Sequence, residues 1–338
     1  REQAKWFEGK LKDRFEIKTK IIGSQQNEEK EGRVLNRIIR VGLRGWQYEP
    51  DQRHAEIIVK TLGLENARPV KTPGEEDSKK EVEENMQELD RGKSSEYRGM
   101  TARANYLAQD RIDIQYVVKE LSRAMSAPTV GDWKRLKRLG RYLVGRPRVV
   151  NSYPWQEETN VLIGYSDSDW AGCKKTAKST SGRVIQRGSH YIRSWSSTQQ
   201  CITLNSGEAE LIAMVKTSTE VMGVIQLAGD WGLKMEGEIL ADSAAALGVV
   251  KRKGCGKLRH VRVGQLWIQE KESTGELEYK KLKGEWNPAD AGTKHLSESK
   301  MRYFMETVLQ EPVGGRAETS LRVAGEGQES KENAEWTM

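Results

Sequence analysis

Cysteines and long apolar runs are scarce in this sequence, and each scarcity excludes a class of protein. Cys173, Cys201 and Cys255 form no CxxC pair and have no histidine at zinc-ligand spacing, which argues against a disulfide framework and a zinc-binding module. We expect reduced thiols in an intracellular protein, either cytoplasmic or nuclear. No stretch approaches the roughly 18 apolar residues that a membrane span requires, and the first residues carry no signal-peptide pattern.

The composition is polar. Only 36% of the 338 residues are hydrophobic and 31% are charged, so solvated helices, linkers or tails are expected over a good part of the length. A chain of this length is expected to form two or more domains. The net charge of +7 fits a polyanionic partner but is also common in ordinary soluble proteins. Because no initiator methionine begins the sequence, we expect a fragment of a longer protein.

The first 148 residues are predicted to combine a small mixed unit with a helical one. Residues 1–70 alternate polar helix with short strand and include a hairpin near Gly45, and the polar segment 72–95 is predicted to be an exposed linker. Residues 96–148 are predicted to be helical. Their last helix carries leucines on one side and cations on the other, namely Lys134, Arg135, Lys137, Arg138 and Arg141. These cations are either a solvated face or a surface that contacts phosphates, since Lys and Arg bind polyanions without sequence preference.

The rest of the chain predicts an α/β sheet with helices on its faces. The expected strands are 161–166, 182–188, 190–196, 237–241 and 276–282, and the expected helices are 206–228, 243–252, 260–273 and 288–309. Short glycine-containing turns join the first three strands, which indicates an antiparallel meander. The polar residues from Pro312 onwards are predicted to be disordered.

Acidic residues lie where several of these elements begin or end. Asp167 and Asp169 follow the first strand, Glu210 lies near a helix start, Asp242 follows the fourth strand, and Asp290 lies in the helix start NPAD. A carboxylate at the end of a buried strand is costly unless a cation neutralises it. Two strand ends and two helices could bring four of these carboxylates to one point, which predicts a metal site.

Each acid also has a simpler interpretation. A DxD pair is common in turns, Asp242 could cap the helix that follows it, and the helix dipole favours an acid at the position of Asp290. Glu208 lies three residues after Asn205 and fits a capping box, whereas Glu210 has no such explanation. These interpretations account for the acids one at a time but not for their joint occurrence in this order of strands and helices.

Six ordered motifs carry a resemblance to a known family. The strings GYSDSDWAGC, KSTSGRVI, SWSSTQQCITLNSGEAELIAM, ILADSAAALGV, RHVRVGQLWIQEK and NPADAGTKHL resemble the ribonuclease H domain of copia-type retrotransposon polyproteins, over roughly residues 160–297. The helical segment before them, which begins YRGMTARANYLAQDRIDIQ, resembles the part that links polymerase to nuclease. Residues 1–73, which end in ARPVKTP, resemble the end of the reverse transcriptase.

The resemblance implies a fold and an order of domains. The fold would be a ribonuclease H-like mixed five-stranded α/β sheet flanked by helices, preceded by a partial reverse-transcriptase palm and a helical connection. The expected units are a palm remnant (1–73), a linker (74–95), a helical thumb or connection (96–150), a ribonuclease H-like domain (160–311) and a disordered tail (312–338).

The resemblance also implies a catalytic site. It places the family's metal ligands on Asp167, Glu210, Asp242 and Asp290, with Asp167 as the bridging ligand. The implied reaction is hydrolysis of the RNA strand of an RNA–DNA hybrid by two Mg²⁺ ions about 3.5–4 Å apart, with Mn²⁺ as a substitute. Carboxylates suit this ion, because Mg²⁺ is a hard cation that prefers oxygen ligands.

Some features depart from the family pattern or stay open. No histidine lies between residues 261 and 294, so proton handling is unassigned, with Glu285 as one candidate, and His295 is interpreted as a helix-surface residue. A basic segment is predicted either to contact phosphate or to be solvated, and comprises Lys251, Arg252, Lys253, Lys257, Arg259 and His260. The paired aspartates of a polymerase YxDD motif are absent from the sequence, so no DNA synthesis is expected.

The sequence supports two functions and, less strongly, a third. The first is a magnesium-dependent endonuclease that cuts RNA–DNA hybrids, and the second is an inactive nucleic-acid-binding remnant of a polyprotein. A transposase or integrase of the DDE type is weaker, because such enzymes use three acids and usually carry a zinc region that three scattered cysteines do not supply. The expected partners are an RNA–DNA hybrid and the rest of the Pol polyprotein, and no membrane.

Overall fold

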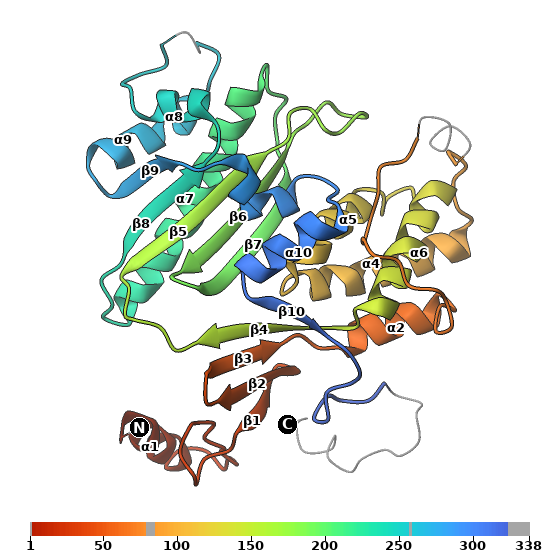
Figure 1. Cartoon of the computed structure of the whole chain (residues 1–338), viewed down its shortest axis with the longest axis vertical. Coiled ribbons are helices and arrows are strands. Elements are labelled where there is room, and N and C mark those ends of the chain that lie inside the picture. Colours follow the sequence, from red (N-terminus) through yellow and green to blue (C-terminus); the bar gives the residue numbers. More distant parts are fainter. Residues whose placement is uncertain (1, 79–84, 257–258, 324–338) are drawn as a thin grey trace.

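Two five-stranded sheets and a helical unit make up the computed structural model (Figure 1), which describes residues 2–78, 85–256 and 259–323. The first sheet is antiparallel throughout, in the order β1-β2-β3-β4-β10. Its strands are β1 (Glu31–Val34), β2 (Arg37–Gly42), β3 (Gly45–Glu49), β4 (Arg148–Pro154) and β10 (Gln310–Val313). The turn between β2 and β3 confirms the hairpin expected near Gly45.

The second sheet is mixed, in the order β7-β6-β5-β8-β9. Its strands are β5 (Val161–Ser168), β6 (Thr180–Arg187), β7 (His190–Thr198), β8 (Glu236–Ala241) and β9 (Leu277–Lys281). The first three form the predicted antiparallel meander, and β8 and β9 run parallel to β5. The mixed five-stranded sheet flanked by helices is therefore confirmed. Because β5 and β8 are parallel neighbours, their carboxyl ends meet at one edge of the sheet.

Helices cover both faces of the second sheet. On β6, the adjacent residues Val184 and Ile185 point to opposite faces and join different apolar clusters. The cluster of Ile185 contains side chains of α7 (Ser206–Asp230), α8 (Ala244–Val250) and α9 (Trp267–Ser273). The cluster of Val184 contains Ile112, Phe304 and Ala291, which come from α5 (Ile112–Arg123), α10 (Glu298–Thr307) and the 3₁₀ turn η3 (Pro288–Gly292). Two further 3₁₀ turns are η1 (Val263–Gln265) and η2 (Gly284–Trp286).

The long helix α7 is the core helix of this sheet. It confirms the helix expected over 206–228 and begins with Asn205, whose side chain accepts a hydrogen bond from the Glu208 backbone N–H at 2.9 Å. Of the described helices, α7 is the one long and apolar enough to cross a membrane by length and composition. Its apolar side chains Leu211, Met214 and Val221 lie in the buried cluster against the sheet, which accounts for that composition.

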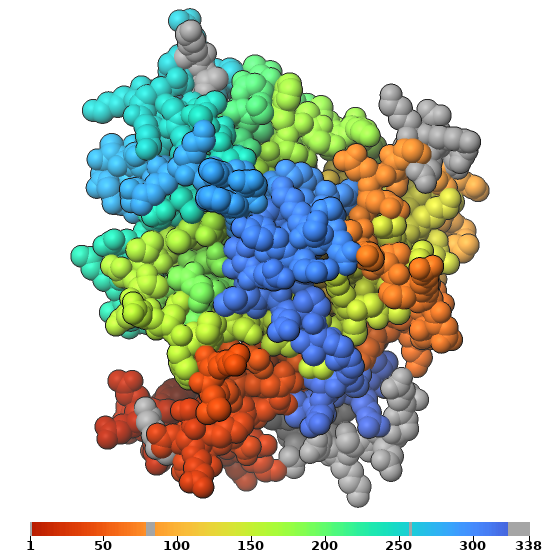
Figure 2. Space-filling model, in the orientation of Figure 1, coloured from red at the N-terminus to blue at the C-terminus, as the bar shows by residue number. Residues whose placement is uncertain are grey.

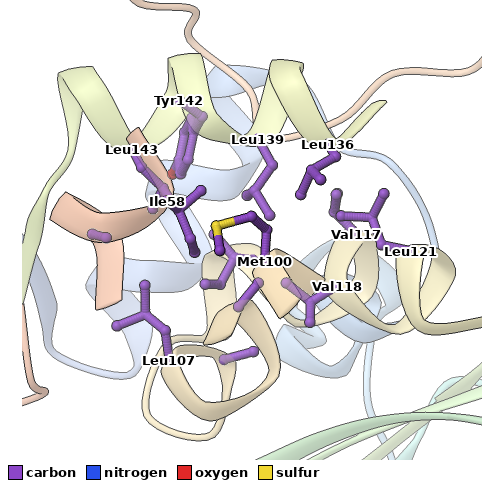
Figure 3. Close-up of a cluster of buried hydrophobic side chains, with 14 of the residues drawn as sticks. Ile58, Met100, Leu107, Val117, Val118, Leu121, Leu136, Leu139, Tyr142 and Leu143 are labelled. Atoms are coloured by element: carbon purple, nitrogen blue, oxygen red, sulfur yellow. The ribbon is translucent and has the colours of Figure 1, made fainter. Parts of the chain in front are cut away.

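The helical unit has a core of its own (Figure 3). Apolar side chains of α2 (Arg53–Thr61), α4 (Arg91–Ala108), α5 and α6 (Val130–Gly145) form one buried cluster. Helix α6 begins with a capping box between Thr129 and Asp132, and α4 with the Asp90 side chain. Helix α1 (Glu2–Lys12) has no buried residue.

Several predicted bounds are corrected by the structure. The helix expected over 288–309 is two elements, η3 and α10, and the helix expected over 260–273 begins only at Trp267. The predicted tail is wrong at its start: Pro312 and Val313 belong to β10, which pairs with β4, and Gly315 accepts a hydrogen bond from Gln52. Residues 324–338 of that tail, and 79–84 of the predicted linker, lie outside the described residues.

The described residues pack across the predicted units. The first sheet joins β1–β3 from the N-terminal segment to β4 and to β10, which lies at the end of the nuclease-like segment. Figure 2 shows the C-terminal residues, in blue, between the green sheet region and the orange and yellow helical unit. The domain boundaries themselves remain a prediction.

Candidate metal centre

Three carboxylates converge at the edge of the second sheet where β5 and β8 end. Asp167 lies near the end of β5, and Asp242 directly follows β8, in which Ala241 pairs with Ser166. Glu210 lies in the second turn of α7, which packs on these strands. One oxygen from each of the three acids lies within 4.8 Å of the other two. This separation allows a single cation to contact all three side chains.

Glu210 is the most unusual of these acids. Its Oε1 accepts a hydrogen bond from the Ser168 backbone N–H at 3.3 Å, whereas its buried Oε2 has no hydrogen-bond partner among the described residues. Burial, and then the charges of Asp167 and Asp242, raise the pKa of Glu210 to about 9. Burial and the charge of Asp290 also raise the pKa of Asp242. A buried carboxylate oxygen without a donor, next to two further acids, matches the environment that a divalent cation requires.

Asp290 lies beside Asp167, close enough for each carboxyl group to affect the pKa of the other. Burial and the Asp290 charge raise the pKa of Asp167. Burial would likewise raise the pKa of Asp290, but hydrogen bonds from Lys294 and Lys300 lower it. Lys294 Nζ lies 2.8 Å from Asp290 Oδ1, and Lys300 contacts Oδ2. The structure thus brings all four predicted acids together, and the fourth already carries two cationic partners.

Close backbone packing holds the segment that carries Asp290. Asn287 Nδ2 donates to the Ser166 carbonyl at 2.8 Å, which ties η3 to β5. Gly182 of β6 faces η3 so closely that an added Cβ would lie 2.2 Å from the Ala289 carbonyl oxygen. Thr293 donates from its hydroxyl to Asp167 Oδ2. A glycine on the strand and an Asn-Pro start on the turn therefore allow the acid to approach the sheet.

Asp169 does not join the cluster. Its Oδ1 accepts a hydrogen bond from the Thr180 backbone N–H, and the side chain also lies against Gly172. It therefore closes the loop between β5 and β6, which agrees with the turn-forming interpretation of this residue.

The lysines and the threonine beside the acids were not predicted as site residues. Thr293 and Lys294 belong to the motif NPADAGTKHL, and Lys294 follows Asp290 by four residues, a spacing that signals an ion pair. Lys300 lies ten residues from Asp290, and no local pattern links the two. His295 is not on a helix surface as expected: it lies between η3 and α10, partly buried, with its ring 5.0 Å from that of Tyr116. Glu285 is exposed in η2, and its role stays a prediction.

The basic segment before α9 lies close to the start of α7. His260 Nε2 is 3.2 Å from Glu208 Oε2, and the same carboxylate accepts a hydrogen bond from the Leu204 backbone N–H at 2.7 Å. Lys251, Lys253 and Arg259 are exposed, Arg252 donates to the Cys255 carbonyl, and Lys257 lies outside the described residues. Nucleic-acid binding by this segment stays a prediction.

The cations of α6 have partners within the chain. Arg135 contacts Asp77 and Asp132, and Arg138 contacts Glu75 and Thr72. The other contacts on this face are from Lys134 to Asn85 Oδ1, at 2.7 Å, and from Arg141 to the Arg68 carbonyl, at 2.9 Å. Lys137 is exposed. Four of the five cations therefore have partners within the chain, and phosphate contact by this face stays a prediction.

Comparison with known proteins places the chain among transposon polyproteins. No family model matches it. The Pol polyprotein of transposon RE1 from Arabidopsis thaliana is 31% identical over 246 residues, which cover 72% of this chain and 16% of that protein. The corresponding protein of transposon RE2 from the same plant is 29% identical over 261 residues, which cover 76% of this chain and 18% of that protein. The chain therefore spans less than a fifth of the length of these two relatives.

Among solved structures, the crystal structure of LC11-RNase H1 in complex with an RNA/DNA hybrid matches 37% of this chain and 88% of that chain, with a TM-score of 0.26 and 18% sequence identity. The mixed sheet in the order β7-β6-β5-β8-β9, with helices on both faces, is the ribonuclease H-like mixed five-stranded sheet that the sequence resemblance implies. The chain belongs to the retrovirus-related Pol polyproteins of copia-type transposons.

Proposed function

We propose that this protein hydrolyses the RNA strand of RNA–DNA hybrids in a reaction that depends on Mg²⁺, or on Mn²⁺ in its place. The observation that carries the proposal is the convergence of Asp167, Glu210 and Asp242 from two parallel strands and a helix, with Asp290 beside them. Membership of the Pol polyproteins supports it. As part of the same proposal, the rest of the Pol polyprotein is a partner of this protein, and the protein is located inside the cell.

The residues present fit a divalent cation. Asp167, Glu210 and Asp242 would hold it, and the unpartnered Oε2 of Glu210 would gain the positive partner that burial denies it. Bound ions would activate a water molecule and stabilise the leaving oxygen. Mg²⁺ suits this set because all of the ligands are oxygens.

The chain's own side chains would prepare this centre. Lys294 and Lys300 keep Asp290 ionised, and Thr293 orients Asp167 by its hydroxyl hydrogen bond. Glu210 holds a proton near neutral pH and must release it when a cation binds. We therefore expect the cation to bind more tightly at higher pH.

The test is cleavage of a labelled RNA–DNA hybrid in Mg²⁺ by the full chain and by Asp242→Asn. We expect the variant to lose activity by about a hundredfold or more, because a ligand of the reaction centre is removed. Glu220→Gln, on α7 but outside the cluster, is the matched control and should cut at the parent rate. Equal cleavage by parent and Asp242→Asn would refute the assignment.

A second candidate is an inactive nucleic-acid-binding remnant. The observation that favours it is the pairing of Asp290 with both Lys294 and Lys300, which neutralises the fourth acid without any metal. Under this function the folded protein would bind the hybrid and leave it intact in Mg²⁺ and in Mn²⁺. Polymerase activity is not part of either proposal, since the paired aspartates are absent from the sequence.

A further inference from the structure

An acidic segment of the chain lies along the cationic face of α6. Residues Glu75, Glu76 and Asp77 are consecutive acids, and Figure 1 shows this part of the chain in orange beside α6. Arg138 donates from Nη1 to Glu75 Oε1 at 2.5 Å, and Arg135 donates from Nε to Asp77 Oδ2 at 2.8 Å. The two arginines are three residues apart on the helix and therefore project from one face.

These contacts reproduce the way arginines bind a phosphate backbone. Arg135 reaches Asp77 Oδ2 with both Nε and Nη2, and Arg138 reaches Glu75 and the Thr72 hydroxyl with its two terminal nitrogens. Guanidinium groups bind carboxylate and phosphate oxygens with the same planar geometry. A row of acids at this spacing is thus a substitute for a polyanion.

The ion pairs are weak enough to be exchanged. Both pairs are partly exposed: Arg135 is 43% exposed and Asp77 24%, and Arg138 is 24% exposed and Glu75 61%. Exposed pairs of this kind contribute little to stability, because water and salt screen them. Residues 74–78 form no helix or strand, so no regular backbone hydrogen bonding holds the acids in place.

Firmer contacts anchor the chain on both sides of the acids. Pro73 is buried, and an added Cβ on Gly74 would lie 2.6 Å from Val117 Cγ2, so this part is packed against α5. Beyond the acids, the Leu89 backbone N–H donates to the Pro128 carbonyl at 2.9 Å. Loss of the acid–arginine pairs would therefore leave the fold intact.

We propose that the cationic face of α6 is a binding surface for a nucleic-acid backbone, and that Glu75 and Asp77 occupy this surface in the free protein as an intramolecular competitor. The inference rests on the proposed function for its choice of nucleic acid as the partner. Binding exchanges carboxylate contacts of Arg135 and Arg138 for phosphate contacts.

The experiment measures binding of a short labelled RNA–DNA hybrid in EDTA, where no cleavage occurs. The variant Glu75→Gln, Glu76→Gln, Asp77→Asn should bind on the order of tenfold more tightly at about 50 mM salt. The two freed arginines should also make the slope of log K against log salt more negative by about 1.8, because each phosphate contact contributes about 0.9 to that slope. Arg135→Gln with Arg138→Gln in that background should remove both gains.

The control variant changes the net charge by the same amount, at positions away from α6. Glu157, Glu158 and Glu236 are exposed, and the combined change of all three to Gln adds three positive charges away from α6. Equal tightening by this control, or no tightening by the first variant, would overturn the proposal. The single change Asp77→Asn, which keeps the Glu75 pair, should give a smaller gain in the same direction and serves if the triple variant unfolds.

Measuring hybrid binding tests this inference, whereas measuring hybrid cleavage tests the proposed function. A hybrid that is bound more tightly by the neutralised segment but never cut would leave the surface established and the nuclease refuted. A hybrid that is cut in Mg²⁺, with binding indifferent to the acids at 75–77, would establish the nuclease and refute the surface.

Discussion

Neutralising Glu210 should change how the stability of the metal-free protein depends on pH. The folded state raises the pKa of this buried acid from 4.5 to about 9, whereas the unfolded chain leaves it near 4.5. Between these two values the folded state binds one more proton than the unfolded state. The free energy of unfolding must therefore fall as the pH rises through this window.

The slope can be worked out from that shift. One group contributes about 1.4 kcal/mol per pH unit inside the window, so from about pH 5.5 to about pH 7.5 the cost is roughly 3 kcal/mol. Glu210→Gln removes this contribution and keeps the shape of the side chain. The stability of the variant relative to the parent should therefore grow by roughly that amount over this pH range.

The assay is urea unfolding followed by tryptophan fluorescence in EDTA at both pH values. Glu220→Gln on the same helix is the control, since its carboxylate is 39% exposed and pairs with Arg183 at 3.5 Å. The reasoning would be refuted if the free energies of unfolding of the parent and of Glu210→Gln changed by the same amount between the two pH values. Added Mg²⁺ should stabilise the parent at the higher pH and leave Glu210→Gln unchanged, because a ligand is missing.

Two further predictions concern the surroundings of the metal centre. Gly182→Ala should lower stability by about 1–3 kcal/mol and reduce hybrid cleavage, because its Cβ would clash with the Ala289 carbonyl and displace η3. Gly229→Ala on α7, where nothing lies within 4 Å of an added Cβ, should keep both urea midpoint and activity, and equal losses in the two variants would contradict the packing argument. His260→Ala should weaken hybrid binding in EDTA several-fold, because the contact to Glu208 holds the basic segment at the start of α7. The urea midpoint should stay unchanged. Unchanged hybrid binding would contradict this role of His260.

The location of the acids was largely predictable from the sequence. Asp167 and Asp242 follow apolar strands, and parallel neighbours in a sheet end at one edge, so their meeting follows from local pattern and topology. Glu210 has no capping role that would explain its position, unlike Glu208. The order of strands and helices could be predicted for the same reason: apolar periodicity and turn residues are local signals.

Only the tertiary structure decided which charges meet. Lys300 approaches Asp290 because α10 packs against η3. Glu75 and Asp77 reach Arg138 and Arg135 across about sixty intervening residues. The pairing of β10 with β4 likewise joins segments that lie far apart in the chain. Contacts of this kind depend on packing rather than on periodicity, so the sequence shows which residues are charged and the fold decides which of those charges are available to a ligand.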